Sequence, residues 1–583
     1  MLRITDFHVP IANDGDVSYN NIEPPMEALA ARLRLPLHAL GEAAILRRGI
    51  DARRRNGAPI SYVYQLEFSL AGGEKEEKRF LADNSRSRNS VKNLTAAPEP
   101  RPILWDEAAA LREKLAQGQA GGTVRGEGRP VVVGFGPAGM FAALLLARAG
   151  LSPLVLERGA DVESRTTQVA NFWAGKSPLD PTTNVQFGEG GAGTFSDGKL
   201  TTRVDSPLIR DVLSAMVDFG APEEIKILHK PHIGTDELVH VVKNLRQEII
   251  ANGGEVRFLS TVRELECDSS HNITAVVTED GQRIKASAVF LGIGHSARDT
   301  YHRLRAMGIA MEAKPFAVGV RIEHPQEIID RAQYGRPAIV RDGTGRETEP
   351  RLPVADYSLT WQDRSNPNSR SVYSFCMCPG GKVVAAASEE GRLVTNGMSL
   401  HARDSGVANA ALLVNVRPED FGGDVLGGIE FQRKYEELAY RTGGGDYTAP
   451  VQAVGDFIAT VEGTPRCDTK DFCVAPTYRP GVKNSLLTDC LPEFVTASLA
   501  AALPAFDRKI KGYGAPDVPI TGVEMRSSAP CRIVRDRESY QSLSHGGLYP
   551  IGEGAGYAGG IMSAACDGLN AVLAYLRSLG HNV

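Results

Sequence analysis

The sequence predicts an α/β protein in which a parallel sheet is joined by an α+β insertion and preceded by a small α+β domain. First, a glycine turn at 134–139 lies between an apolar strand-like run and an apolar helix-like run, and a second strand follows. Second, the run 288–294 is another buried strand that ends in glycines. Third, the pattern from about 310 to 519 changes to strands alternating with amphipathic helices, without a further turn of this kind.

Residues 1–95 are predicted to form a ferredoxin-like α+β domain. The ranges 2–9 and 43–50 fit strands, and 25–35 fits a helix. Between 60 and 70, apolar residues alternate with polar ones, which is typical of a strand with one buried face. The resulting order of strand, helix, strand and strand favours the ferredoxin-like arrangement.

Residues 96–128 are predicted to be a linker helix followed by a glycine-rich link. The polar stretch 72–93 and the prolines after it indicate a mobile connection. The range 105–117 then fits a charged helix, and 118–128 is rich in glycine. A mobile segment is therefore expected before the parallel sheet.

The range 131–159 reads as a strand, a glycine turn, a helix and a second strand that ends in an acid. Gly134 permits the tight turn, Gly136 lets the backbone approach a pyrophosphate, and Gly139 lets the helix pack closely on the strand. The helix N-terminus offers free N–H groups and the positive end of its dipole to phosphates. Glu157, at the end of the second strand, is placed to accept a hydrogen bond from a ribose hydroxyl. These features predict a bound dinucleotide.

Two further glycine clusters indicate that the dinucleotide carries a flavin. Five glycines within 188–198 leave a backbone with few side chains, which suits a flat ring and a diphosphate. Farther along, a strand ends at Gly552, Glu553 follows, and the helix expected over 562–576 begins after a glycine pair. Glu553 can hold ribityl hydroxyls, and the amides near Gly560 can stabilise negative charge on the reduced ring. An ordinary NAD enzyme has no need of this second half-site.

On these segments the sequence resembles the glutathione-reductase-type FAD flavoproteins, and more closely the bacterial FAD-dependent dehydrogenases of the NAD(FAD)-utilising type. The similarity runs over nearly the whole chain and is carried by the ranges 190–200, 231–236, 294–299, 374–381 and 552–560. It implies a Rossmann-type FAD-binding domain made of residues 129–309 and 520–583, with a substrate or cap domain of residues 310–519 inserted between them. The family itself has no settled substrate.

The resemblance also implies roles for individual residues. Glu157 is expected to bind the adenosine ribose, and Val262 the adenine through its backbone. Gly190, Gly191 and Thr194 are expected to bind the region between the diphosphate and the flavin. Glu553 departs from many flavoproteins, which carry an aspartate at this place. The cofactor-binding residues expected are Gly134, Gly136, Pro137, Ala138, Gly139, Glu157, Arg158, Gly190, Gly191, Thr194, Val262, Gly292, Gly552, Glu553, Gly560 and Ile561.

Three residues are candidates for catalysis. Lys199 can steady the reduced flavin or an anionic substrate, with a surface ion pair as the alternative. His295 can act in the flavin pocket or on the substrate, with a structural role as the alternative. Cys376 can form a redox dithiol with Cys378, although a bridge across one residue would be strained, and packing in a pocket wall is the alternative.

Arg526 and Arg532 lie shortly before the second half-site in the sequence. Two guanidinium groups close to a flavin would favour a carboxylate or phosphate substrate. Structural ion pairs are the alternative, and the sequence does not decide between the two.

Composition and charge limit the class of protein. The chain has 583 residues, a formal net charge of −5 and 42% hydrophobic residues, which is typical of a globular protein and does not favour nucleic-acid binding. Its start has no apolar signal core, and no apolar segment is long enough to span a bilayer, so a cytoplasmic location without a membrane span is predicted. Eight cysteines in this length indicate reduced thiols, and no motif predicts a metal site.

The sequence thus predicts an FAD-dependent oxidoreductase, a dehydrogenase that transfers hydride or electrons between a small organic substrate and the flavin. Without a second nucleotide domain, NAD(P)H could dock only transiently over the ring, and an electron-carrier protein, a quinone or oxygen are the other redox partners to consider. Two further functions stay open. One is a flavin-dependent enzyme that modifies RNA gripped by the arginines of 47–55, and the other is a non-catalytic flavoprotein for binding or sensing.

Overall fold

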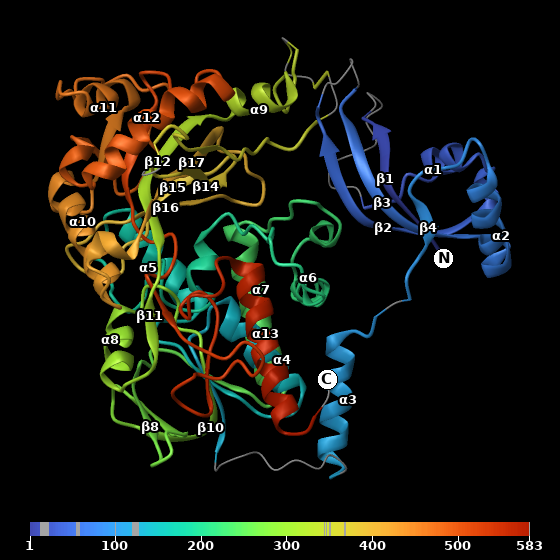
Figure 1. The fold of residues 1–583 in the computed structure, drawn as a ribbon, viewed down its shortest axis with the longest axis horizontal. Helices are drawn as coiled ribbons and strands as arrows, with labels where there is room; N and C mark the ends of the chain where they lie inside the picture. The colour runs from blue at the N-terminus through green and yellow to red at the C-terminus, as the bar shows by residue number, and fades with distance from the viewer. Residues whose placement is uncertain are drawn as a thin grey trace. The chain divides into compact units, whose positions relative to one another are not determined.

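The computed structural model describes residues 1–11, 22–53, 59–99, 101–118, 128–342, 344, 347–348, 351–366, 369–581 and 583. They form two compact units: unit 1 comprises residues 1–102, 221–232 and 330–355, and unit 2 comprises residues 103–220, 233–329 and 356–583. Both units combine helices with sheets (Figure 1). The prediction of a mixed α/β protein is therefore confirmed, whereas the domain boundaries expected from the sequence stay predictions.

Unit 1 contains a four-stranded antiparallel sheet with the strand order β2-β3-β1-β4. Its elements are β1 (Leu2–Pro10), α1 (Met26–Leu33), β2 (Leu40–Asp51), β3 (Ser61–Leu70), α2 (Gly73–Arg86) and β4 (Leu94–Ala96). Alternation along β3 puts Tyr62, Leu66 and Phe68 into the core, as the period of two predicted. This order of helices and strands is that of a split β-α-β motif.

The range 72–93 is not the mobile connection that the sequence predicted, because α2 occupies most of it. The helix is polar on most sides, but Phe80 packs against the core of unit 1. The carboxylate of Glu77 is buried, accepts a hydrogen bond from the N–H of Leu70 (3.2 Å) and pairs with the amino group of Met1 (2.7 Å). A narrow apolar stripe and these buried contacts hold the helix, although most residues of this range are charged or polar.

The basic segment 47–55 is described as far as Arg53. Nε of Arg47 lies 3.0 Å from Nδ1 of His229, and the guanidinium of Arg53 forms a bidentate pair with Asp51 (2.8 Å for both contacts). These two arginines therefore already have partners within unit 1. Residues 54 and 55 of the basic segment, like most of the glycine-rich link before the parallel sheet, lie outside the described residues.

Unit 2 contains the parallel sheet that the glycine turn predicted. Five parallel strands lie side by side in the order β7 (Glu255–Arg257), β6 (Leu154–Leu156), β5 (Arg129–Val133), β10 (Arg283–Leu291) and β22 (Leu548–Pro550). The first residues of β10 also pair antiparallel with β9 (Ile273–Thr278), which pairs with β8 (Val262–Cys267). Helix α4 (Pro137–Arg148) packs against α7 (Thr235–Ala251) and α13 (Ile561–Ser578) (Figure 1). Sheets of this type bind ligands at the carboxyl ends of their strands.

A second sheet of unit 2 is mixed and mainly antiparallel. Its strands follow the order β13 (Thr360–Trp361), β14 (Val372–Cys378), β17 (Val407–Val416), β12 (Phe316–Pro325), β20 (Pro519–Glu524), β18 (Ala449–Ala453) and β19 (Val482–Asn484). Strands β12 and β17 are buried along nearly their whole length, which suits their many apolar and small residues. Helices α10 (Gly427–Gly443), α11 (Val454–Val461) and α12 (Glu493–Lys509) pack against strands of this sheet (Figure 1).

The remaining elements are α3 (Leu104–Ala116), α5 (Val162–Trp173), α6 (Leu208–Asp218), α8 (Arg298–Ala306), α9 (Gln326–Tyr334), and the antiparallel pairs β11 (Met311–Ala313) with β21 (Cys531–Ile533) and β15 (Lys382–Ala385) with β16 (Thr395–Met398). Across the described ranges, none of the helices has the length and apolar character needed to cross a bilayer. The same residues include no group of three or more His, Cys, Asp or Glu side chains arranged to hold a metal ion.

Candidate cofactor and substrate cleft

The carboxyl ends of β5, β6, β10 and β22 open into a cleft of ≈ 550 Å³ in unit 2. Its walls come from the glycine turn before α4, the glycine loop that follows α5, the segment after β10, the second sheet near β14 and β20, and the segment that leads into α13. These segments are far apart in the sequence. The cleft therefore exists only when unit 2 is folded.

The turn before α4 is built for the close approach of a ligand. Gly134 has a φ of +92°, a conformation that favours glycine. A Cβ added to Gly139 would collide with the carbonyl oxygen of Gly134, so Gly139 is needed for the packing of α4 on the turn. A Cβ added to Gly136 would meet only the Cα of Gly191, at 3.7 Å, among the atoms of the described residues. Since the packing of the protein does not require Gly136, its absent side chain points to a ligand in the cleft.

Glu157 follows β6 at the cleft and is only 5% exposed. Its Oε2 accepts a hydrogen bond from the N–H of Phe135 (2.7 Å), and its Oε1 accepts from the N–H groups of Gly159 and Gly188 (both 2.9 Å). A carboxylate has about four lone-pair positions, so these three bonds leave one for a ligand hydroxyl. Glu157 therefore joins the glycine turn to the glycine loop and keeps one acceptor position for the cleft.

The glycine loop is held by Arg165, a residue of α5 that sequence reasoning missed. Its side chain is fully buried and donates hydrogen bonds of 2.5–3.3 Å to the backbone carbonyls of residues 184, 185, 188, 189 and 191. Burial lowers the pKa of Arg165 to about 10, against the opposing effect of Glu157 and Glu189. No sequence signal marks this role, because a single arginine in a helix does not reveal that its partners are carbonyls of a distant loop.

Another wall of the cleft carries the start of α13. Gly560 caps this helix, Ile561 begins it, and both line the cleft, where the free N–H groups of the first turn favour negative charge. Glu553 accepts a hydrogen bond from the N–H of Ala529 (3.1 Å). Burial raises the pKa of Glu553 to about 7, and the charge of Lys314 opposes this rise. Near neutral pH the Glu553 carboxyl can therefore either donate a hydrogen bond to a hydroxyl or accept one.

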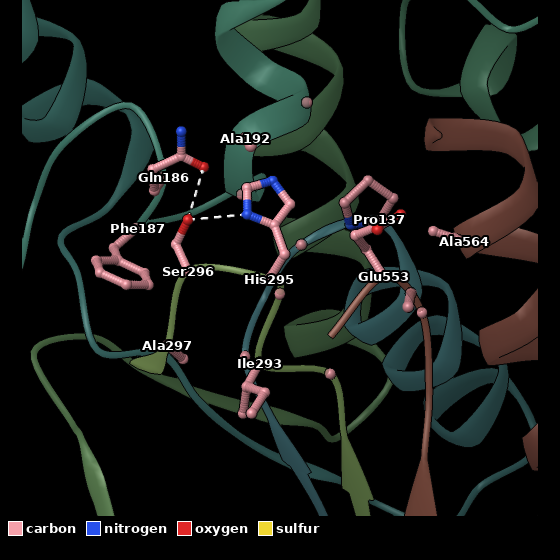
Figure 2. A pocket seen from close by; sticks show the side chains of 18 of the residues that line it. Pro137, Gln186, Phe187, Ala192, Ile293, His295, Ser296, Ala297, Glu553 and Ala564 are labelled. Atoms are coloured by element: carbon pink, nitrogen blue, oxygen red, sulfur yellow. Dashed lines mark hydrogen bonds between the residues drawn. The ribbon is translucent and has the colours of Figure 1, made fainter. Parts of the chain in front are cut away.

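His295 follows the glycines after β10 and lines the cleft. Its Nδ1 lies 2.9 Å from Oγ of Ser296, and that hydroxyl donates to Oε1 of Gln186 (3.3 Å), as the dashed lines in Figure 2 show. Burial, together with the positive charges of Arg526 and Arg298, lowers the pKa of His295 to about 3. The imidazole is therefore neutral near pH 7. Its Nε2 has no hydrogen-bond partner within the described parts of the chain and is left for a ligand.

Cys376 lies in a bulge of β14, where the pairing with β17 shifts between Phe375 and Cys378. Its backbone has a φ of +43°, and its carbonyl accepts hydrogen bonds from Nη1 of Arg321 (2.9 Å) and from the thiol of Cys378 (3.3 Å). The Cys378 thiol, and then the charges of Arg321 and Lys199, lower the pKa of Cys376 to about 5 against the opposing effect of burial. Cys376 lines the cleft, whereas Cys378 is fully buried.

Lys199 and Asp197 follow the glycine loop and have different surroundings. The carboxylate of Asp197 is buried and accepts hydrogen bonds from the hydroxyl of Ser399 and from the guanidinium of Arg403 (3.1 Å from Nε). Lys199 lines the cleft and forms neither an ion pair nor a hydrogen bond with any residue that the structure describes. Its ammonium group is therefore available to a ligand.

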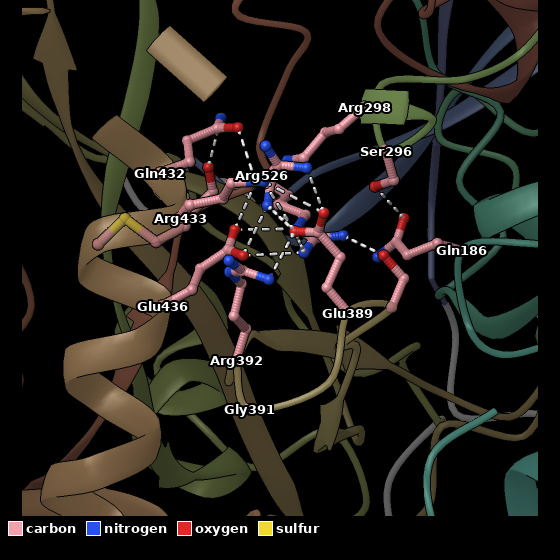
Figure 3. A network of polar contacts seen from close by, with 12 residues as sticks. Gln186, Ser296, Arg298, Glu389, Gly391, Arg392, Gln432, Arg433, Glu436 and Arg526 are labelled. Carbon is pink, nitrogen blue, oxygen red and sulfur yellow. Dashed lines mark hydrogen bonds and ion pairs between the residues drawn. The ribbon is translucent and has the colours of Figure 1, made fainter. Parts of the chain in front are cut away.

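Arg526 and Arg532 form the ion pairs that the sequence left open as an alternative. Arg526 borders the cleft, but its Nε and Nη2 bind the carboxylate of Glu436 (2.9 and 2.8 Å). Glu436 is fully buried and also accepts two hydrogen bonds from Arg298 (2.6 and 2.8 Å), as Figure 3 shows. Arg532 pairs with Glu312 (2.7 Å). Each arginine thus has a carboxylate partner in the protein, buried for Arg526 and exposed for Arg532.

Most of the residues that the sequence proposed for the cofactor and for catalysis meet at this cleft. Those that line it are Gly134, Gly136, Pro137, Ala138, Glu157, Arg158, Gly191, Lys199, Val262, Gly292, His295, Cys376, Gly552, Glu553, Gly560 and Ile561. Gly139, Gly190 and Thr194 do not line it. Gly139 packs against the turn, and Gly190 donates its N–H to the carbonyl of Phe135 (2.8 Å), so they support its walls.

This set of donors and acceptors fits FAD. The first turn of α4, beside the open space over Gly136, suits a diphosphate. The remaining acceptor position of Glu157 suits a ribose hydroxyl, and Glu553 suits the ribityl chain. The N-terminus of α13 suits a ring that becomes negative on reduction.

One comparison with known proteins agrees with this fit. Residues 315–527 match the family described as "FAD-dependent protein, C-terminal domain-like". A protein of Clostridium beijerinckii (strain ATCC 51743 / NCIMB 8052), described as "Uncharacterized protein", is 46% identical over 569 residues, which cover 97% of each chain.

Two solved structures show a remote similarity. L-proline dehydrogenase from P. horikoshii is 11% identical with a TM-score of 0.29, over 78% of this chain and 95% of that chain. The 3-ketosteroid-delta4-(5alpha)-dehydrogenase from Rhodococcus jostii RHA1 is 12% identical with a TM-score of 0.30, over 78% of this chain and 98% of that chain.

Proposed function

We propose that this chain, which belongs to one family with the Clostridium beijerinckii protein and matches a family of FAD-dependent proteins over residues 315–527, is an oxidoreductase. It would transfer hydride or electrons between a small organic substrate and FAD bound in the cleft of unit 2. The observation that carries the proposal is the meeting of the glycine segments 134–139 and 552–561 at one cleft. Each leads into a helix, α4 or α13, and each brings a helix N-terminus to the cleft. FAD can use both ends, one for its diphosphate and one for its reduced ring.

The proposed division of labour follows from the contacts of the cleft. Bound FAD would supply the redox chemistry by exchanging two electrons with the substrate at its ring. The N–H groups at the start of α4 would hold the diphosphate, Glu157 the adenosine ribose, and Val262 the adenine through its backbone. Glu553 would hold the ribityl hydroxyls, and the first turn of α13 would stabilise the charge of the reduced ring.

Lys199, His295 and Cys376 are the proposed catalytic residues. The neutral His295 can hydrogen-bond to a substrate through Nε2 without introducing a charge. Lys199 can bind an anionic group, and the Cys376 thiolate can donate electron density or act as a nucleophile. To complete the redox cycle, we propose that NAD(P)H docks transiently over the flavin or that the flavin passes its electrons to an electron-carrier protein.

Anaerobic titration of the purified holoprotein tests the proposed function. We expect about one FAD per chain, and bleaching of the flavin absorbance by at least one member of a panel of hydroxy acids, amines, NADH and NADPH. A protein that contains no FAD and takes none up from solution would overturn the proposal. A bound flavin that dithionite reduces, but no metabolite or nicotinamide does, would overturn its enzymatic part and favour a binding or sensing role.

Cys376 is expected to react as a thiolate at neutral pH. Because its pKa is lowered to about 5, its alkylation rate should rise with a midpoint near pH 5 and be constant above about pH 7. Replacing Cys378 with alanine or Lys199 with methionine removes a group that lowers this pKa, so either change should move the midpoint upward. Iodoacetamide labelling followed by peptide mass spectrometry measures each site separately. Cys267, whose pKa is raised by burial and neighbouring acids, serves as the internal control, and a Cys376 midpoint as high as that of Cys267 would contradict the expectation.

A further inference from the structure

We propose that the end of the cleft formed by residues 199–203 and the second sheet binds a small organic anion, such as a carboxylate attached to an apolar body. This inference rests on the proposed function and names the class of substrate that the flavin site would take. It follows from a difference between the polar groups at this end. The hydrogen-bond donors have no partner among the described residues, whereas the carboxylates already accept hydrogen bonds from other side chains.

Two cations at this end lack a partner among the residues that the structure describes. Lys199 and Arg203 both line the cleft, and neither forms an ion pair or a hydrogen bond with the described residues. Lys199 is half-buried and Arg203 is exposed at the surface. An ammonium group and a guanidinium group that share a cleft without a counter-charge favour the binding of an anion.

The acidic side chains at the same end are neutralised by other residues. Asp197 is bound by Arg403 and Ser399, as described above. Both carboxylate oxygens of Glu524 accept hydrogen bonds from the buried Arg321, at 2.8 Å to Oε1 and 2.9 Å to Oε2. Neither carboxylate is therefore available to compensate Lys199 or Arg203.

Two neutral side chains add free donors. Asn396 lines the cleft, and its Oδ1 accepts hydrogen bonds from Nη2 of Arg321 (2.9 Å) and from the N–H of Gly397 (2.8 Å). Because Oδ1 is used in this way, the N–H groups of the side-chain amide are left to donate to a ligand. Oγ of Ser374 accepts from the N–H of Leu359 (2.8 Å), which leaves its hydroxyl proton free to donate. Ser374 also lines the cleft. These donors suit the oxygens of a carboxylate or a phosphate.

Apolar side chains complete this end of the cleft. Phe375 is 37% exposed although it lies within β14, and Met377 of the same strand and Tyr357 also line the cleft. An exposed aromatic ring beside unpaired cations suits a ligand with an apolar body and a charged group. The diphosphate of FAD is not this anion, because its expected place is the first turn of α4, which belongs to a different wall.

The binding of matched aromatic probes tests the inference. Benzoate and phenyl phosphate carry the anion, benzamide is the neutral counterpart, and benzylamine is the cation. We expect at least one of the two anions to bind the holoprotein, measured by calorimetry and by perturbation of the flavin spectrum, and to bind at least 10-fold more tightly than benzamide or benzylamine. A preference for benzoate would indicate a carboxylate substrate, and a preference for phenyl phosphate would indicate a phosphorylated one.

Variants locate the site. Replacing both Lys199 and Arg203 with methionine should weaken binding of the anion by about 10-fold to 100-fold, because charge-assisted hydrogen bonds are lost, and should leave benzamide binding unchanged. Lys176→Met removes an exposed lysine that does not line the cleft and should have no effect. Equal FAD content and equal melting temperature of all three proteins show that the variants are folded.

The outcomes separate this inference from the proposed function. If FAD binds and is reduced, but the anions bind no more tightly than benzamide or the double variant binds them as well as the parent, the anion site is wrong and the flavin site stands. If the protein takes up no FAD, the proposed function fails. Calorimetry with benzoate on the same protein still reports on the cations, because that measurement does not depend on the flavin.

Discussion

Gly136→Asp is expected to give a folded protein that has lost FAD. Gly136 is the N-cap of α4, with φ of −81° and ψ of −177°, a conformation that any residue can adopt. Aspartate is among the preferred N-cap residues because its carboxylate accepts hydrogen bonds from the free N–H groups of the first turn. The new carboxylate would therefore accept hydrogen bonds from the same N–H groups that would hold the diphosphate, and it would place a negative charge beside them. We expect FAD affinity to fall on the order of 100-fold, measured as the flavin-to-protein ratio and by titration of the apoprotein.

Gly481→Asp is the matched control for this substitution. Its added Cβ would meet no atom within 4 Å in the described structure, Gly481 is absent from the cleft wall, and the change in charge is the same. The control should keep the FAD content of the parent. If Gly136→Asp also kept it, or if its apoprotein melted well below the apoprotein of the parent, the assignment of this turn to the diphosphate would be contradicted.

Glu436→Gln is expected to cause the largest loss of stability. Glu436 receives four hydrogen bonds from Arg298 and Arg526, all three side chains are nearly or fully buried, and Glu389 supplies a further carboxylate at 2.6 Å from Arg298 (Figure 3). Glutamine keeps the shape of the side chain but removes its negative charge, so the buried guanidinium groups of Arg298 and Arg526 lose one of their carboxylate partners. Removing one partner from such a pair costs about 3–5 kcal/mol. Urea unfolding of the apoprotein and of the holoprotein measures the free energy of unfolding directly.

The neighbouring residue in α10 gives the control. Glu437 pairs with Arg441 on the surface, where the two side chains are 44% and 70% exposed. Exposed pairs of this kind contribute little, so Glu437→Gln should change the free energy of unfolding by about 0.5 kcal/mol or less. A loss below about 1 kcal/mol for Glu436→Gln would show that water or other groups compensate the two arginines, contrary to the expectation.

The parts of the fold that depend on local rules could be predicted from the sequence. The turn at 134–139 requires glycines for backbone reasons, and so β5, α4 and β6 were found near their observed bounds. The alternation of β3 likewise marked its buried face. Helix α2 was missed because its stability depends on a narrow apolar stripe and on the buried contacts of Glu77. The strand order of the second sheet could not be derived, since it follows from pairings between distant strands.

The candidate site divides in the same way. Glycines and acids at characteristic spacings pointed to residues that now line one cleft, among them Gly136, Glu157 and Glu553. Arg165 and Arg321 were not recognised, because the importance of a buried arginine depends on acceptors supplied by remote segments. The same limitation left the role of Arg526 undecided, and only its bonds to Glu436 show that its charge is already balanced.

The cleft is formed by segments from the beginning and from the end of unit 2 in the sequence, and this has a consequence for biosynthesis. A translating ribosome releases the Gly134–Gly139 turn long before it releases Gly552 and α13, which form the other half of the proposed flavin pocket. Nascent chains would therefore expose a half-finished pocket for most of their elongation. Binding of the flavin would have to wait for the synthesis of α13, so a prematurely terminated product that lacks this helix would stay colourless.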